Sequence, residues 1–167
     1  TTSFSLYEIF HSFIKIIDSM STHTPPICAI TVDVDTIPHY RNIHGLPAPH
    51  TVPPQDPIYT IAIPRILDLF QRHQIRGTFF IIGADIEAHQ DYLLELHRAN
   101  HELANHSWSH YYHLRTLSRE IQREEIQKTE EALEHLLGKR SLGFRTPGYN
   151  ISSSILEILQ THQYLYD

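Results

Sequence analysis

The stretch "ICAITVDVD", residues 27–35, determines how the rest of the chain is interpreted. Its run of apolar and β-branched residues is typical of a strand that is buried on both faces, as strands of parallel sheets are. Residues two apart in a strand face the same side, so Asp33 and Asp35 are predicted to be neighbours. Both lie at the carboxyl end of the strand, where parallel α/β folds gather their functional residues.

Further strands and helices alternate along the chain after this stretch. The apolar runs "GTFFII" (77–82) and "HELAN" (101–105) predict strands, and "SLGFRTPG" (141–148) and "YLYD" (164–167) predict shorter ones. Such alternation implies a parallel α/β architecture. A closed (β/α) barrel needs more strands and about 250 residues, so we expect either an open sheet or a barrel that lacks some of its units. Helices are predicted over 64–73, 91–99, 119–137 and 152–162, the third between an N-cap at Ser118 and a stop at Gly138.

Two segments stand apart from this alternation. Residues 1–25 have apolar residues at helical spacing and predict an N-terminal helical extension to a main domain of residues 26–167. The proline- and histidine-rich segment 36–57 is predicted to be a long loop, and ordered loops of that length are usually functional.

Composition and charge exclude several classes of protein. The 167 residues are 41% hydrophobic and carry a formal net charge of −6, which predicts a folded domain with no electrostatic affinity for nucleic acid. Cys28, the single cysteine, excludes a disulfide framework and is expected to be buried. No run reaches the ~20 apolar residues of a membrane span. The N-terminal segment lacks the pattern of a secretion signal; the compartment stays open, and would be cytoplasmic if this N-terminus is complete.

A histidine pair in "ANHSWSH", residues 104–110, predicts a metal site. His106 and His110 are four residues apart, and on a helical turn they would project from one face and could share an ion. The chain has 14 histidines, so the pair alone is a weak signal. With Asp35 as third ligand, the set would have the three protein ligands and open position of a catalytic zinc site. Asp33 would then be free to act as a general base.

A third motif, "FRTPGY" at residues 144–149, places an arginine before a Pro-Gly turn. Arg145 could hold a carboxylate, and backbone N–H groups of the turn could face an oxyanion. Taken singly, each motif has an ordinary alternative: an aspartate that caps a turn, a chance histidine pair, or an arginine in a surface loop.

Together, "TVDVD", "NHSWSH" and "FRTPGY", in this order and at these separations, resemble the first three motifs of the polysaccharide deacetylase family, carbohydrate esterase family 4. The resemblance implies a distorted (β/α) barrel and a hydrolase that removes N-acyl groups, above all N-acetyl groups, from a carbohydrate. It also implies a divalent metal, with zinc favoured. The roles that it implies are Asp33 as catalytic base, Asp35, His106 and His110 as metal ligands, Arg145 as the residue that positions the base, and the Tyr149 backbone amide as part of the oxyanion hole.

The chain departs from the family pattern in two ways. Its aspartates are separated by one residue, which resembles a branch with cyclic-amide hydrolases and aminosugar deformylases, so an imidase-like or deformylase-like hydrolase stays an alternative. The family's general-acid histidine has no counterpart, because the sequence ends at Asp167, which resembles the acidic residue before it; His39, His44 and His162 are only weak substitutes.

These departures predict a barrel that is incomplete at its C-terminus, and an exposed sheet edge that would favour self-association into a homo-oligomer. A non-catalytic module that binds metal or carbohydrate is the second alternative. In either case, Tyr111, Tyr112 and His113 follow the histidine motif closely and could line a sugar groove.

Overall fold

Three parallel strands form the centre of the protein. The computed structural model describes residues 27–47 and 56–167, so the predicted extension over residues 1–25 lies outside the described residues. Strands β1 (Ile30–Val34), β2 (Gly77–Ile81) and β3 (Glu102–Asn105) pair in the order β1-β2-β3. The register places Asp33 beside Phe80 and Ile81 beside Asn105. The predicted parallel α/β architecture is therefore confirmed.

The two shorter predicted strands, at 141–148 and 164–167, are present only as single β-bridges. Phe144 pairs with Asn105, and Tyr166 pairs with Gly143, both in parallel. The Arg145 amide donates to the Asn105 carbonyl at 2.9 Å, and the Phe144 amide donates to the Tyr166 carbonyl at 3.0 Å. These segments continue the sheet beyond β3, so "FRTPGY" leaves the sheet on the same edge as the ends of β1 and β3.

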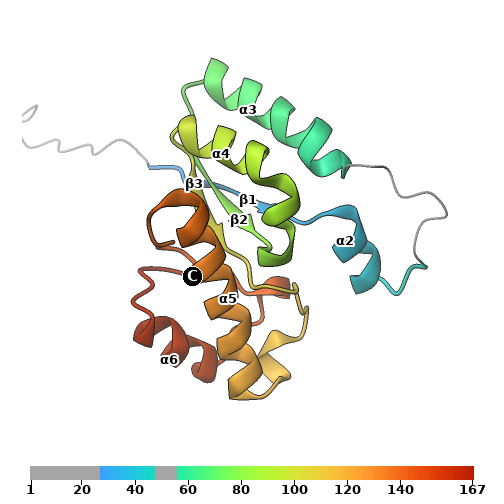
Figure 1. Cartoon of the computed structure of the whole chain (residues 1–167), viewed down its shortest axis with the longest axis vertical. Helices are drawn as coiled ribbons and strands as arrows, with labels where there is room; N and C mark the ends of the chain where they lie inside the picture. The colour runs from blue at the N-terminus through green and yellow to red at the C-terminus, as the bar shows by residue number, and fades with distance from the viewer. Residues whose placement is uncertain (1–26, 48–55) are drawn as a thin grey trace, which may run out of the picture.

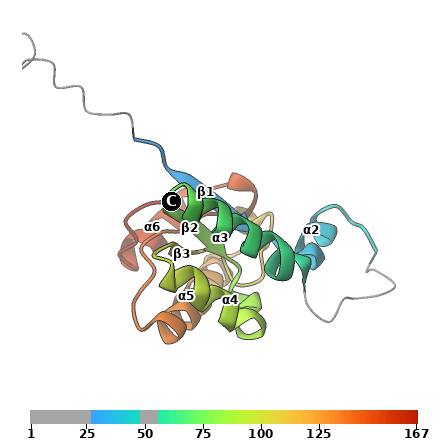
Figure 2. The same cartoon turned by 90° about the horizontal axis from the view of Figure 1, so that it is seen from above.

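The long helices α3, α4, α5 and α6 follow one another around the sheet in chain order (Figures 1 and 2). The Ser118 side chain caps α5 by accepting from the Ile121 amide, and Gly138 ends it in the left-handed conformation, with φ 67°. Within the described ranges, no helix combines the length and hydropathy that a bilayer crossing needs. The bounds are Ile63–Arg72 for α3, Gln90–Arg98 for α4, Arg119–Leu137 for α5 and Ser153–Thr161 for α6.

Short helical segments lead into and out of the strands. The bounds are Ile37–Ile43 for α2, Ile58–Ala62 for the π-helix η1, and Gly83–Asp85, Glu87–His89, Leu114–Thr116 and Pro147–Tyr149 for the 3-10 helices η2, η3, η4 and η5. The prediction of a structureless loop over 36–57 was wrong near its start, where residues 37–43 form α2, and η1 begins directly after its end. Pro38 occupies the first turn of α2, a position that suits a residue with fixed φ and no amide hydrogen.

The prediction that residues 27–34 form a strand buried on both faces was also wrong in part. The strand begins at Ile30, and among its residues Val34 alone is buried. β1 has one strand neighbour among the described residues and lies at the edge of the sheet. Cys28, expected to be buried, precedes the strand and is exposed.

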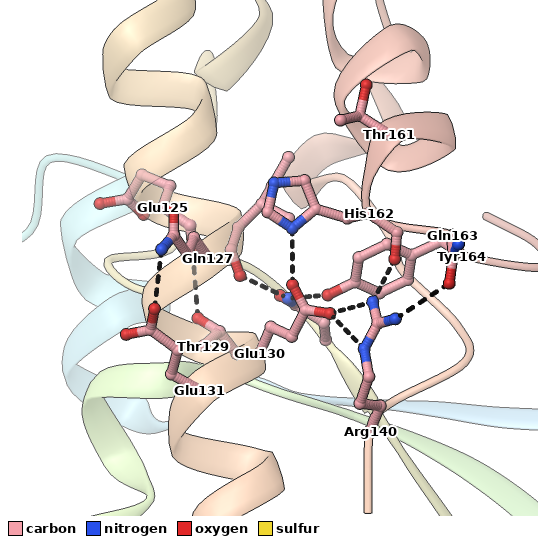
Figure 3. A network of polar contacts seen from close by, with 12 residues as sticks. Glu125, Gln127, Thr129, Glu130, Glu131, Arg140, Thr161, His162, Gln163 and Tyr164 are labelled. Atoms are coloured by element: carbon pink, nitrogen blue, oxygen red, sulfur yellow. Dashed lines mark hydrogen bonds and ion pairs between the residues drawn. The ribbon is translucent and has the colours of Figure 1, made fainter.

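Two apolar clusters pack the helices onto the sheet. The larger one joins β2 and β3 to α3, α4 and α5, and the smaller one joins Phe144 to α5 and α6. A polar network beside the smaller cluster contains the buried Glu130, which accepts from Arg140 and lies 2.7 Å from Nδ1 of His162 (Figure 3). His162 is half-buried in this network and ties the end of α6 to α5.

Candidate metal centre

The six residues singled out in the sequence meet at the carboxyl edge of the sheet. Asp35 directly follows β1, His106 directly follows β3, and Arg145 follows the bridge at Phe144. The parallel sheet explains the convergence, since the carboxyl ends of parallel strands share one edge.

The candidate ligands form a compact group of three. Oδ1 of Asp35 lies 3.5 Å from Nε2 of His106 and 3.3 Å from Nε2 of His110. One ligand atom from each residue lies within 4.8 Å of the other two. Asp35 Oδ1 is itself buried without a hydrogen-bond partner, so the site holds an unsatisfied carboxylate oxygen between two imidazole nitrogens. A divalent cation that accepts N and O ligands fits this donor set.

The turn that carries the two histidines is not helical, so the prediction of a helical turn was wrong. Residues 106–110 follow β3 as irregular backbone, in which Ser107 (φ 62°) and His110 (φ 54°) are left-handed. The amides of Gly83 and Ala84 donate to the carbonyls of Ser107 and Trp108, which attach the turn to η2. These left-handed residues, rather than a helical repeat, turn the His110 ring back toward His106. The centroids of the two rings lie 4.9 Å apart.

A second hydrogen bond orients one of the ligands. Nδ1 of His106 lies 2.7 Å from the backbone carbonyl oxygen of Arg145. With Nδ1 donating to a carbonyl, Nε2 is the free nitrogen that faces Asp35, the arrangement usual for metal-binding histidine. The backbone of the third motif, at Arg145, thus orients His106, a candidate metal ligand from the second motif.

Their surroundings keep two of the candidate ligands in the forms that bind metal. Burial lowers the pKa of His110 to about 4, although nearby Asp35 opposes the shift. Burial alone would raise the pKa of Asp35, but contact with His106 and, at acidic pH, the charge of His110 outweigh it, and this pKa lies below its usual value. At neutral pH the site therefore has a neutral His110 and an ionised Asp35, and deprotonated ligands are those that coordinate a cation.

Asp33 is held by two donors beside the ligand group. Nη1 of Arg145 donates to Oδ1 of Asp33 at 2.5 Å, and the Tyr149 phenol donates to Oδ2 at 2.8 Å. Arg145 is fixed in turn by Thr31, whose Oγ1 accepts from Nη2 at 3.0 Å, and by the Phe80 ring, whose centroid is 4.0 Å from the guanidinium carbon. The Asp33 carboxylate is therefore oriented by hydrogen bonds to both of its oxygens.

Tyr149 contributes in a way that the sequence did not indicate. Its phenol reaches the site, and the hydrogen bond to Asp33 raises the pKa of the phenol. The backbone amide predicted to face an oxyanion donates to the Thr146 carbonyl at 3.0 Å in this structure. Its contribution to an oxyanion hole remains a prediction, and it requires that hydrogen bond to be shared or released.

Sequence reasoning missed a carboxylate that borders the site. Nε2 of His39, on α2, lies 3.4 Å from Oδ1 of Asp85, and Thr36 Oγ1 donates to Oδ2 of the same carboxylate at 2.9 Å. The rings of His39 and His110 are 5.7 Å apart. Asp85 belongs to no motif in the sequence, and His39 was one weak candidate among many histidines. The other candidate in this segment, His44, is exposed at the end of α2.

A groove adjoins the ligand group on the α2 side. It has a volume of about 350 Å³, and its walls include His110 and the partly exposed rings of Tyr111 and Tyr112. Gly148, with φ 67°, lets the third motif approach the Tyr112 ring, because a Cβ there would lie 3.0 Å from it. The Tyr112 ring therefore lies against both the groove and the third motif. Its remaining lining residues are Asn42, Ile43, His113 and Leu117.

Comparison with known proteins agrees with this geometry. The model of the polysaccharide deacetylase family matches residues 55–166. A Helicobacter pylori peptidoglycan deacetylase is 28% identical over 64% of this chain and 36% of its own length. A Bacillus cereus peptidoglycan-N-acetylglucosamine deacetylase is 32% identical over 50% of this chain and 30% of its own length. The chain thus spans about a third of the length of these two relatives.

A solved structure supports the fold assignment. A Bacillus anthracis protein described as a carbohydrate esterase family 4 pseudoenzyme superposes with a TM-score of 0.65, at 22% identity, over 83% of this chain and 41% of that protein. The shared fold is the (β/α) barrel type, of which this chain forms adjacent parallel units. With the family model covering most of the chain and the three motifs meeting at one edge of the sheet, the chain belongs to the polysaccharide deacetylase family.

Proposed function

We propose that this chain carries the metal centre of a hydrolase that removes N-acyl groups, chiefly N-acetyl groups, from a carbohydrate. The observation that carries the proposal is the position of Asp33 beside the group Asp35, His106 and His110, with Arg145 holding it in place. The family membership supports the same reaction, because the relatives named above are deacetylases of peptidoglycan.

Three side chains would hold the ion, with zinc favoured by two imidazoles and one carboxylate. A bound divalent ion would supply Lewis acidity, which lowers the pKa of a coordinated water and polarises the acyl carbonyl. Asp35 offers Oδ1, and each histidine offers Nε2. Three protein ligands leave a position for water and substrate, as in catalytic zinc sites.

Asp33 would act as the general base. It accepts a proton as water attacks the carbonyl carbon, a contribution of roughly 10²–10⁴-fold. Arg145 holds the carboxylate in position, and the Tyr149 phenol must yield its place on Oδ2 for the water. The C–N bond then breaks, the departing amine takes up the proton that Asp33 accepted from water, and the free carboxylic acid is released.

The groove beside His110 is the proposed position of a sugar ring next to the scissile amide. Aromatic faces suit the apolar faces of pyranose rings, and Tyr111 and Tyr112 are 48% and 41% exposed there. A pyranose held in this groove would place its acyl substituent against the metal centre, because His110 belongs to both.

A non-catalytic binding module is the second candidate. The structural likeness to a pseudoenzyme favours it, since that protein has the fold without being named for an activity. Arg145 and the Tyr149 phenol argue against it here, because simple metal retention requires neither a second carboxylate nor groups to orient that carboxylate.

The test is acetate release from N-acetylated chito-oligosaccharides and peptidoglycan fragments by the wild type, Asp33→Asn and a control. Asp91→Asn, on the exposed surface of α4, is the matched control. We expect Asp33→Asn to lose at least ~10²-fold in rate while it retains its zinc. A wild-type chain that binds zinc and sugar but releases no acetate would favour the binding module instead.

A further inference from the structure

The residues between the two histidine ligands lie in a backbone conformation that the local sequence does not favour. Ser107 and His110 are left-handed, although neither is glycine. Non-glycine residues persist there only when the surrounding structure enforces it. Some neighbouring element must therefore hold residues 106–110 in place.

Helix α5 provides that restraint through a buried carboxylate. Oε2 of Glu125 accepts from the Ser109 amide at 2.7 Å, and Oε1 accepts from the Ser109 hydroxyl at 2.9 Å. Glu125 is 6% exposed, and a glutamate is seldom so buried unless it is paired. Both of its oxygens thus bind the residue directly before His110.

The next residue of α5 fixes the other end of the turn. The Ile126 carbonyl accepts from Nδ2 of Asn105 at 2.9 Å, and the Tyr164 hydroxyl accepts from the same nitrogen at 2.7 Å. Oδ1 of Asn105 accepts from the Ser107 amide at 2.8 Å. Figure 3 shows Glu125 and Tyr164 beside the Glu130 network, which joins α5 to the end of α6.

We propose that Glu125 is a positioning residue for the metal ligand His110. The inference rests on the metal centre proposed above and extends it to α5. Ser109 transmits the restraint, because its amide and hydroxyl are both bound and His110 follows it in the chain. Losing the carboxylate would let the His110 ring rotate away from Asp35, whereas His106 would keep its hydrogen bond to the Arg145 carbonyl.

The neighbouring glutamate provides a matched control. Glu124 lies one residue earlier on α5, but it is exposed and pairs with Lys128 at the surface. Glu124→Ala therefore removes one negative charge from the same helix but no hydrogen bond to residues 106–110. Glu125→Gln is the conservative variant: its amide oxygen can accept from the Ser109 amide, and its amide nitrogen can donate to the Ser109 hydroxyl, which accepts as well as donates.

The experiment measures metal binding and folding separately in the full chain. Zinc affinity comes from competition with a chromophoric chelator, ligand geometry from the visible absorption of the cobalt(II) form, and folding from the thermal midpoint of the metal-free protein. We expect Glu125→Ala to weaken zinc binding by about 10–100-fold, a range typical of residues that orient metal ligands. The cobalt spectrum should change with it, while Glu125→Gln and Glu124→Ala stay within about threefold of the wild type.

Ser109→Ala keeps the proposal testable if Glu125→Ala does not fold. It removes one of the two hydrogen bonds without altering α5, and a loss of about threefold to tenfold in zinc affinity is expected. Unchanged zinc affinity and an unchanged cobalt spectrum in folded Glu125→Ala or Ser109→Ala would overturn the positioning role and leave the metal centre intact. A wild-type chain that binds no zinc would overturn the metal centre and the role together.

Discussion

Arg145 binds Asp33 across 112 residues of sequence, through a 2.5 Å contact between Nη1 and Oδ1. The pair joins the first motif to the third and places the proposed base at a fixed position beside the candidate metal ligands. The guanidinium also lies over the Phe80 ring and donates to Thr31, so its plane is fixed from two sides. Such a setting depends on the planar shape of the arginine head group as well as on its charge.

Arg145→Lys should therefore lower the rate of hydrolysis while preserving the metal centre. A lysine ammonium can still attract Asp33, but it cannot bind Asp33 and Thr31 together or stack on Phe80 as a planar group. A misplaced base costs about 10²-fold in rate. Steady-state kinetics and zinc content measure the two effects. A Lys variant with the kinetics of the wild type would show that positive charge alone suffices.

Stability of the metal-free protein should fall as the pH drops from about 6.5 to about 4. The pKa of His110 is lowered from 6.5 to about 4, chiefly by burial. In this window the unfolded chain binds a proton that the folded chain does not, so the unfolded state is favoured as the pH falls. Urea unfolding at several pH values measures the slope.

Two variants test the contribution of His110 to that slope. Burial also lowers the pKa values of His89, His97 and His101, so His110→Gln, which cannot take up the proton, should reduce the slope between these pH values without abolishing it. His135→Gln replaces an exposed histidine of α5 and should leave it unchanged. Equal slopes in the wild type and His110→Gln would refute the assignment.

Tyr112→Ala should weaken binding of an oligosaccharide more than it slows the reaction. The ring forms part of the groove beside His110 and lies outside the ligand group. Loss of one aromatic face should raise KM roughly tenfold with little change in kcat. Tyr112→Phe keeps the ring and should retain the KM of the wild type. Tyr40→Ala removes an exposed ring of α2 that lies tilted against His44, outside the groove lining, and should also leave KM unchanged. A KM unaltered by Tyr112→Ala would place the sugar elsewhere.

The sequence predicted the parallel α/β architecture because alternating apolar runs and helix signals are short-range patterns, and its three motifs singled out the residues that meet at the edge of the sheet. Apolar runs marked β2 and β3, and the cap at Ser118 with the stop at Gly138 marked α5. It could not predict how His106 and His110 converge. Their spacing suggested a helical turn, whereas the turn depends on hydrogen bonds to η2 and α5, which are distant in sequence.

The edge position of β1 and the burial of Glu125 account for the other differences between the predicted and the observed structure. The apolar run 27–34 favours a buried strand, but β1 lies at the edge of the sheet, so Cys28 and most of the strand are accessible. Glu125 stands in a glutamate-rich helix and looks like a surface charge. One signal could have marked it: Gln122, Ile126, Thr129 and Leu133 share its face at helical spacing, and all of them are buried.

The most direct test of the metal centre is the zinc content of the purified chain and of Asp35→Ala, with Asp91→Ala as the control on the exposed surface of α4. If Asp35, His106 and His110 converge on one ion, the wild type and Asp91→Ala will each bind one zinc per chain, and Asp35→Ala will not. Zinc bound at the same stoichiometry and affinity after Asp35→Ala would contradict the account.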